Sequence, residues 1–114
     1  MKSNLGDSQR LHHILEAIDE IQTYTADNDF NAFIANSMMR FACIKQIEII
    51  GEAANSITQE TRSTFNDLEW KQIIGIRHIL VHEYFGVDFD LLWQVIINDL
   101  PQLKERVKNI ISAL

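Results

Sequence analysis

The chain has 114 residues, which suits one domain, and we expect a single domain over residues 1–114. Apolar residues make up 46% of it, which excludes a disordered chain, while 4 glycines and one proline argue against an all-β or loop-rich fold. The formal charge is −6, from 10 basic and 16 acidic residues, so a nucleic acid would be repelled except at a local basic site.

The first predicted helix covers about residues 8–25. Aliphatic residues recur in it at helical spacing and form one apolar stripe: Leu11, Ile14, Leu15, Ile18 and Ile21. Asp27, Asn28 and Asp29 end this helix, because such residues favour turns and caps over helix interiors.

The second predicted helix covers about residues 30–57, with a break near Asn36 and Ser37. It is apolar on more than one side, through Phe41, Cys43, Ile44, Ile47 and Ile49. This pattern indicates two contact surfaces, one inside the bundle and one in an oligomer. Gly51 costs about 1 kcal/mol relative to alanine in a helix, so we expect it to allow close approach of another helix.

Residues 58–66 form a polar connection with room for one helical turn. Asp67 is the predicted N-cap of a third helix over about residues 68–84, and Gly86 stands where a C-terminal cap belongs. Asp88 caps a fourth helix over about residues 89–111, and Pro101 should kink it because proline lacks an N–H donor. The predicted fold is all-α: an up-and-down bundle of four main helices, the fourth kinked at Pro101.

The third predicted helix concentrates four polar residues in an apolar setting: Arg77, His78, His82 and Tyr84. An arginine offers a permanent cation with a fork of donors suited to phosphate, and a histidine exchanges a proton near neutral pH. On a continuous helix, His82 lies about 140° around the axis from Arg77, so one copy does not aim both at one point. Two copies meeting across a twofold axis would bring both pairs into one cleft, so we expect a homodimer.

These residue types suit cleavage of RNA by attack of the 2′-hydroxyl on the adjacent phosphate. His82 is the candidate general base or general acid, or supplies both roles together with its symmetry mate. Arg77 is the candidate for stabilising charge on the phosphorane oxygens. His78 would orient the phosphate or His82, and Tyr84 would donate a hydrogen bond to the phosphate. This reaction needs no metal and no cofactor, and yields a 2′,3′-cyclic phosphate or 3′-phosphate and a 5′-hydroxyl.

Other polar residues have more than one interpretation. Glu52 either holds Arg77 through a charge-assisted bond or is a solvated carboxylate, and Glu48 lies one turn earlier on the same face. His78 and His82, four residues apart, could chelate a metal, but no companion ligand stands at matching spacing, so we expect no metal site. Structural roles are expected for His12, His13, Cys43, Trp70 and Trp93.

Cysteine usage and hydropathy bear on the compartment. The single cysteine excludes an internal disulfide and a multi-thiolate metal site. Residues 1–10 are polar and lack a signal-peptide core, and no apolar run approaches the ~20 residues that span a bilayer. We therefore expect a cytoplasmic protein that does not associate with a membrane.

Several stretches, in order along nearly the whole chain, carry a family resemblance: residues 11–18, 47–54, 70–77 and 81–88, followed by Trp93 and residues 99–101. With the Arg77-x4-His82 spacing and Tyr84, they resemble the HEPN ribonucleases and, more narrowly, the HepT toxins. There are two departures: His78 stands where the family commonly has asparagine, and Glu83 where it commonly has glycine. His78 can still contact phosphate, whereas Glu83 adds negative charge beside the cleft.

The resemblance implies a HEPN-like fold and a metal-independent endoribonuclease toxin of a toxin–antitoxin system. Arg77 and His82 would be its catalytic pair, with RNA and not DNA as the substrate. The resemblance also implies a homodimer, and an MntA-like minimal nucleotidyltransferase as the antitoxin that attaches AMP to Tyr84. AMP on this tyrosine would place a bulky anion on the cleft and block an RNA phosphate.

Two alternatives stay open. The bundle could be a non-catalytic binding or regulatory module that partners a nucleotidyltransferase, which the acidic charge and Glu83 favour. It could also be a structural dimerisation bundle, which explains the apolar second helix but not the cluster of polar residues in the third. RNA cleavage by partner-free protein that is lost on His82→Ala would reject the binding module.

Overall fold

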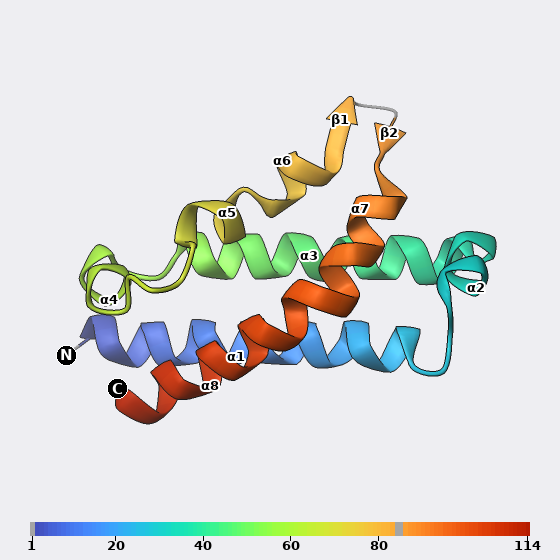
Figure 1. Cartoon of the computed structure of the whole chain (residues 1–114). Coiled ribbons are helices and arrows are strands. Elements are labelled where there is room, and N and C mark those ends of the chain that lie inside the picture. The colour runs from blue at the N-terminus through green and yellow to red at the C-terminus, as the bar shows by residue number, and fades with distance from the viewer. Residues whose placement is uncertain (1, 84–85) are drawn as a thin grey trace.

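The computed structural model describes residues 2–83 and 86–114, and the side chains among them except those of residues 2–5, 79 and 81–83. The chain begins with the long helix α1 (Lys2–Thr25), followed by α2 (Phe30–Ala35) and α3 (Ser37–Asn55) (Figure 1). Asp29 caps α2, and Asn36 caps α3 by accepting a hydrogen bond from the Met39 N–H. The predicted break near Asn36 is therefore confirmed.

The region predicted as one helix over residues 68–84 is instead divided into α5 (Trp70–Ile74), α6 (Ile76–Leu80) and the strand β1 (Val81–Glu83). It is preceded by the short helix α4 (Gln59–Thr64), in the connection where one helical turn was predicted. The first break falls at Gly75, the C-cap of α5. The second coincides with the start of a β-branched and aromatic stretch, which favours extended backbone. The prediction of a continuous third helix is wrong.

The two predicted caps of that helix are also wrong. Glu69, not Asp67, stands at the N-cap of α5, and the Asp67 carboxylate instead faces Arg106 of the last helix at 3.4 Å. Gly86 belongs to the strand β2 (Gly86–Val87), which pairs antiparallel with β1. The Asp88 N–H donates to the Leu80 carbonyl at 2.9 Å and closes this hairpin onto the end of α6. A hydrogen-bonded partner strand thus replaces the helical cap.

The C-terminal helix follows the prediction more closely. It consists of α7 (Phe89–Gln94), the π-helical segment η1 (Val95–Asp99) and α8 (Leu100–Ala113). Asp88 caps it by accepting a hydrogen bond from the Leu91 N–H at 3.0 Å, as predicted. Near the kink predicted at Pro101, the structure has the π-helical segment η1, which ends at Asp99, two residues before this proline. A π turn shifts the hydrogen-bond register where proline supplies no N–H.

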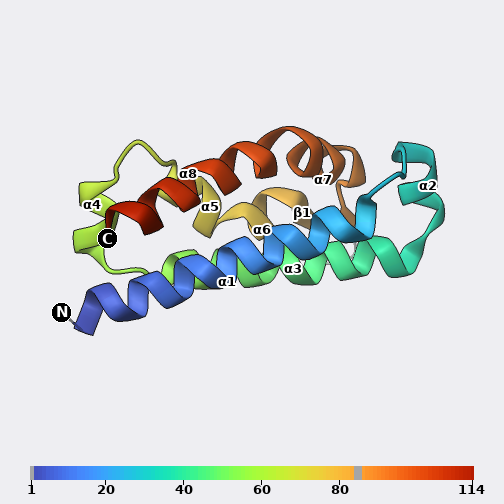
Figure 2. The same cartoon turned by 90° about the horizontal axis from the view of Figure 1, so that it is seen from below.

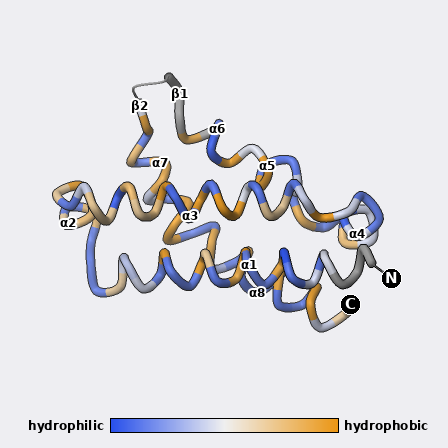
Figure 3. The backbone as a smooth tube through the Cα atoms, turned by 180° about the vertical axis from the view of Figure 1, so that it is seen from behind, coloured by the Kyte–Doolittle hydropathy of each residue, from blue (hydrophilic) through white to orange (hydrophobic). Residues whose placement is uncertain are grey.

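The bundle has two sides. In Figure 2, α7, η1 and α8 lie on one side, whereas α1 and α3 run next to each other on the other. Between them lies the core, which includes the buried thiol of Cys43 as expected. Figure 3 shows hydrophobic residues along the whole length of α3. The all-α fold predicted from the sequence is confirmed, with one short hairpin added to it.

A buried carboxylate ties α1 to the start of α4. Asp7 is 0% exposed and accepts hydrogen bonds from the Thr58 N–H at 3.0 Å, the Thr58 Oγ1 at 2.7 Å and the Thr61 Oγ1. Burial raises the pKa of the Asp7 carboxyl, but the bonds from Thr61 and Thr58 and the charge of Arg10 lower it more, so the net pKa lies below its ordinary value. Sequence reasoning missed this cluster, because an aspartate in a polar N-terminal stretch is usually solvated.

Candidate functional site

Gly51 of α3 sets the position of the segment that carries Arg77. A Cβ atom at residue 51 would lie 3.1 Å from the Ile74 carbonyl oxygen at the end of α5, closer than ordinary van der Waals contact. Both α5 and α6 pack against α3. The close approach expected at Gly51 is therefore confirmed, and it places the end of α5, directly before α6, against α3.

Arg77 projects from α6 and pairs with α3. Its Nε lies 3.3 Å from the Glu48 Oε2, and the two side chains are 49% and 31% exposed. The guanidinium has five N–H donors, so a contact at Nε leaves the rest of the fork for another anion. Glu48, not Glu52, is thus the carboxylate that holds Arg77. Glu52 is exposed one turn further along α3.

The structure describes the other predicted site residues to different extents. The His78 side chain is exposed on α6, and the backbone N–H of His78 donates to the Gly75 carbonyl at 2.9 Å. His82 lies on β1, but its side chain is outside the described part of the structure. Tyr84 lies outside the described residues altogether. Because the helix ends at Leu80, the helical spacing arguments for His82 no longer apply, including the angle from Arg77 and the metal-chelating spacing with His78.

The outer face of α3 borders Arg77. Residues recur on it at spacings of three and four, which places them on one helical stripe: Met38, Phe41, Lys45, Glu48 and Glu52. Met38 is 83% exposed and Phe41 is 60% exposed. This stripe, which we call the outer face, is apolar at Met38 and Phe41 and charged at Lys45, Glu48 and Glu52, and of the residues that predicted a second apolar surface it includes only Phe41. Its use in an oligomer stays a prediction.

A shallow pocket of about 280 Å³ lies on the same side of the bundle, between α1 and α3. Arg10, His13 and Glu52 contribute to it. His13 is exposed there, as expected of a surface residue. In the described part of the chain, no group of three His, Cys, Asp or Glu side chains is arranged to hold a metal ion. No described helix has both the length and the apolar content required to cross a bilayer.

The chain is similar to known proteins over most of its length. The chain is 43% identical over 98 residues to "Putative RNase MJ1380" of Methanocaldococcus jannaschii, which covers 86% of this chain and 90% of that protein. It is 34% identical over 100 residues to "Probable ribonuclease HepT" of Thermococcus cleftensis, which covers 88% of this chain and 91% of that protein. No solved structure matches the chain. The model of the family described as "Ribonuclease HepT-like" matches residues 14–110, and the chain therefore belongs to the HepT-like ribonuclease family.

Proposed function

We propose that this protein is an endoribonuclease toxin that cleaves RNA at a dimer cleft built around Arg77 and His82. The observation that carries the proposal is the placement of Arg77. Its side chain is half exposed, pairs with Glu48 and borders the outer face of α3. A cation fixed at the edge of a surface able to pair with a second copy suits a phosphate site shared between protomers.

The proposed reaction is a transesterification within the RNA backbone. The 2′-hydroxyl oxygen forms a bond to phosphorus and loses its proton to His82 of one protomer, acting as general base. The bond from phosphorus to the 5′-oxygen breaks, and that oxygen takes a proton from the second His82 of the dimer. The products are a 2′,3′-cyclic phosphate and a 5′-hydroxyl, and the step requires no metal ion.

Arg77 would stabilise the extra negative charge on the phosphorane oxygens as they form. Its pairing with Glu48 orients the fork in advance, which lowers the entropy lost when the phosphate binds. His78, exposed on the same short helix, adds a second donor for the phosphate. These two residues would provide the local basic site that a protein of charge −6 needs to bind RNA.

Pairing through the outer face would complete the site. Met38 and Phe41 expose apolar surface at one end of this face, and Glu48 lies beside Arg77 further along the same helix. Burial of such apolar side chains is the main favourable contribution in most homodimer interfaces. A twofold axis across α3 would bring two copies of α6 toward each other, so that each cleft takes residues from both protomers.

Regulation would act on the same cleft. We propose that a minimal nucleotidyltransferase, acting as antitoxin, attaches AMP to Tyr84, which follows β1 closely in the sequence. The bound phosphate would compete with RNA for the guanidinium of Arg77 and repel the RNA backbone. Modification would therefore abolish cleavage without unfolding the protein.

A cleavage assay tests the nuclease. Partner-free protein, checked by intact mass for added AMP, is incubated with tRNA and with defined RNA, with and without EDTA. Wild-type protein should cleave in both conditions, whereas Arg77→Ala and His82→Ala should lose at least a hundredfold in rate. His12→Ala is the matched control, because His12 is an exposed histidine of α1. Full activity in both site variants would refute the proposal.

The acidic charge of the protein favours a second candidate function, that of a non-catalytic module that binds and regulates a nucleotidyltransferase. Glu83, beside His82 in the sequence, adds to that charge. This candidate predicts no cleavage of any RNA by unmodified dimer. It also predicts that the partner's activity changes on adding either wild-type protein or His82→Ala, to the same extent.

A further inference from the structure

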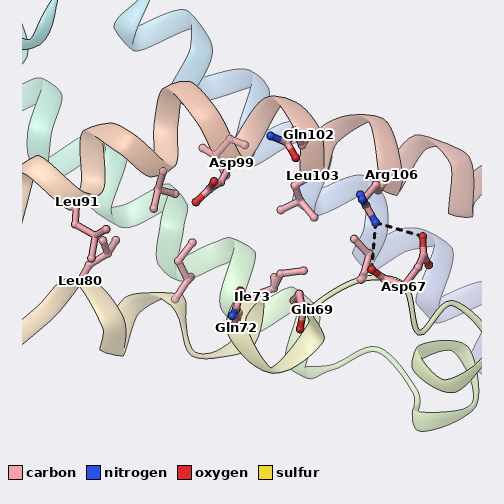
Figure 4. A pocket seen from close by; sticks show the side chains of 14 residues that line it. Asp67, Glu69, Gln72, Ile73, Leu80, Leu91, Asp99, Gln102, Leu103 and Arg106 are labelled. Carbon is pink, nitrogen blue, oxygen red and sulfur yellow. Dashed lines mark hydrogen bonds and ion pairs between the residues drawn. The ribbon is translucent and has the colours of Figure 1, made fainter.

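A groove runs between the α5–α6 segment and the helix formed by α7, η1 and α8 (Figure 4). Its volume is about 530 Å³, and eight of its 14 lining side chains are aliphatic. Ile76 and Leu80 contribute from one wall, and Val95 and Leu103 from the other. The surface between these walls is therefore suited to apolar side chains of a ligand.

The rim of the groove is acidic. Asp67, Glu69 and Asp99 line it together with one guanidinium, that of Arg106. Arg106 is already bound within the rim, because its Nη1 lies 3.4 Å from the Asp67 carboxylate and donates to the Asp67 carbonyl at 3.1 Å. The rim therefore carries a net charge of −2, from three carboxylates and one guanidinium.

Glu69 and Asp99 are the two rim carboxylates outside that pair. Glu69 stands at the N-cap of α5, where its side chain makes no capping hydrogen bond, and Asp99 lies inside the C-terminal helix, where η1 meets α8. Both side chains are exposed, one on each wall of the groove. They are thus placed to receive cationic groups from a ligand that lies between the walls.

The π-helical segment contributes to the same groove. Val95 and Asp99, its first and last residues, both line it, so the π turn presents one apolar and one acidic side chain to the ligand. π turns within α-helices are frequent at functional sites. The combination of two helical walls, an aliphatic floor and an acidic rim corresponds to the helix-in-groove mode of recognition.

We propose that this groove binds a basic amphipathic helical segment of a partner protein. The apolar side of the segment would pack against the aliphatic floor, and its lysines or arginines would pair with Glu69 and Asp99. RNA is excluded by the charge of the rim. A second copy of this chain, with 16 acidic and 10 basic residues, complements the rim less well than a cationic segment does. An uncharged apolar molecule would leave the two carboxylates unused.

None of the residues of the outer face lines the groove. Figure 2 shows α8 and α3 on opposite sides, so a segment in the groove leaves the outer face free to pair with a second copy. The segment would nevertheless contact the helix that carries Arg77, because Ile76 and Leu80 of α6 line the groove. An effect of binding on RNA cleavage rests on the proposed function, whereas the binding itself does not.

Peptide selection tests the inference on the full chain. A phage-displayed library of random 16-residue peptides is panned on wild-type protein and, in parallel, on the Glu69→Lys/Asp99→Lys double variant. Peptides enriched on wild type should have apolar residues at spacings of three and four and a net positive charge. A fluorescein-labelled copy of the best peptide should bind the double variant at least tenfold more weakly, as measured by anisotropy.

Two controls separate the groove from general charge and from folding. Asp90→Lys changes an exposed carboxylate of α7 that does not line the groove, and should alter peptide binding by less than twofold. The double variant changes exposed residues, and circular dichroism should show wild-type helicity. Enrichment of acidic or non-amphipathic peptides, or equal binding by the double variant, would overturn the inference. A change in the dimerisation of the double variant would assign the groove to a second copy instead.

Discussion

Removal of the Asp7 carboxylate should destabilise the protein far more than removal of a surface carboxylate. In Asp7→Ala, the Thr58 N–H and the hydroxyls of Thr58 and Thr61 lose their acceptor inside the protein. Hydrogen bonds to a charged group contribute about 1.5–3 kcal/mol each and are not additive, so we expect a loss of about 2–4 kcal/mol in the free energy of unfolding. For a domain of this size, each kcal/mol lowers Tm by roughly 4 °C.

The stabilisation by Asp7 should depend on pH, in a direction that follows from its lowered pKa. The folded-state pKa of Asp7 is lowered, so the carboxylate stabilises the fold above the unfolded pKa, and this contribution disappears as pH falls through the folded pKa. The gap between wild type and Asp7→Ala should therefore be full at pH 7 and shrink below about pH 4, which is near the ordinary aspartate value.

Urea unfolding followed by tryptophan fluorescence measures both effects, since Trp70 and Trp93 are buried. Asp19→Ala is the matched control, because Asp19 is a mostly exposed carboxylate of the same helix, paired with Lys104 at 2.8 Å. Exposed pairs contribute about 0–1 kcal/mol. The reasoning is refuted if Asp7→Ala costs no more than Asp19→Ala at pH 7, or if the gap stays constant from pH 7 to pH 3.

Three further predictions concern the candidate site. Gly51→Val should push α5 away from α3 and lower the free energy of unfolding by about 1–3 kcal/mol, as measured by urea unfolding. It should also lower RNA cleavage by more than the lost stability explains, whereas unchanged stability would contradict the close contact. Glu48→Gln should lower kcat about tenfold or more without raising KM for RNA, because Arg77 loses its orientation; a rise in KM alone would count against positioning. Met38→Asp with Phe41→Asp should give monomers by analytical ultracentrifugation and abolish cleavage, whereas an unchanged dimer would place the interface elsewhere.

Local patterns in the sequence were sufficient for the long elements. The spacing of aliphatic residues predicted α1 and α3, and the cap at Asp88 was predicted because an aspartate before an apolar helical stretch can accept a hydrogen bond from an N–H of the first turn. The close approach at Gly51 was also inferred from one residue, since a glycine inside a helix is costly unless a neighbour requires it. In these cases the sequence signal lies within a few residues, even where, as at Gly51, the neighbour that explains it comes from another helix.

The candidate site depended on contacts between distant segments. The apolar residues of 68–84 recur at helical spacing, yet the described part, residues 68–83, contains two short helices and a strand, which pack on α3 and pair with β2. Arg77 pairs with Glu48 and not with Glu52 because the close contact at Gly51 fixes the position of α5, and with it that of α6, along α3. Helical spacing alone places both carboxylates on one face and cannot choose between them.

What the sequence by itself determined was the all-α class and the core of the long helices, since these depend on composition and short-range periodicity. The tertiary structure alone decided that Asp7 is buried, that Asp67 pairs with Arg106 and that an acidic groove forms between α5–α6 and α8. Each of these joins residues 39 or more positions apart, or two separate walls of the bundle. A partner at that distance is chosen by how the helices pack, which no local pattern encodes.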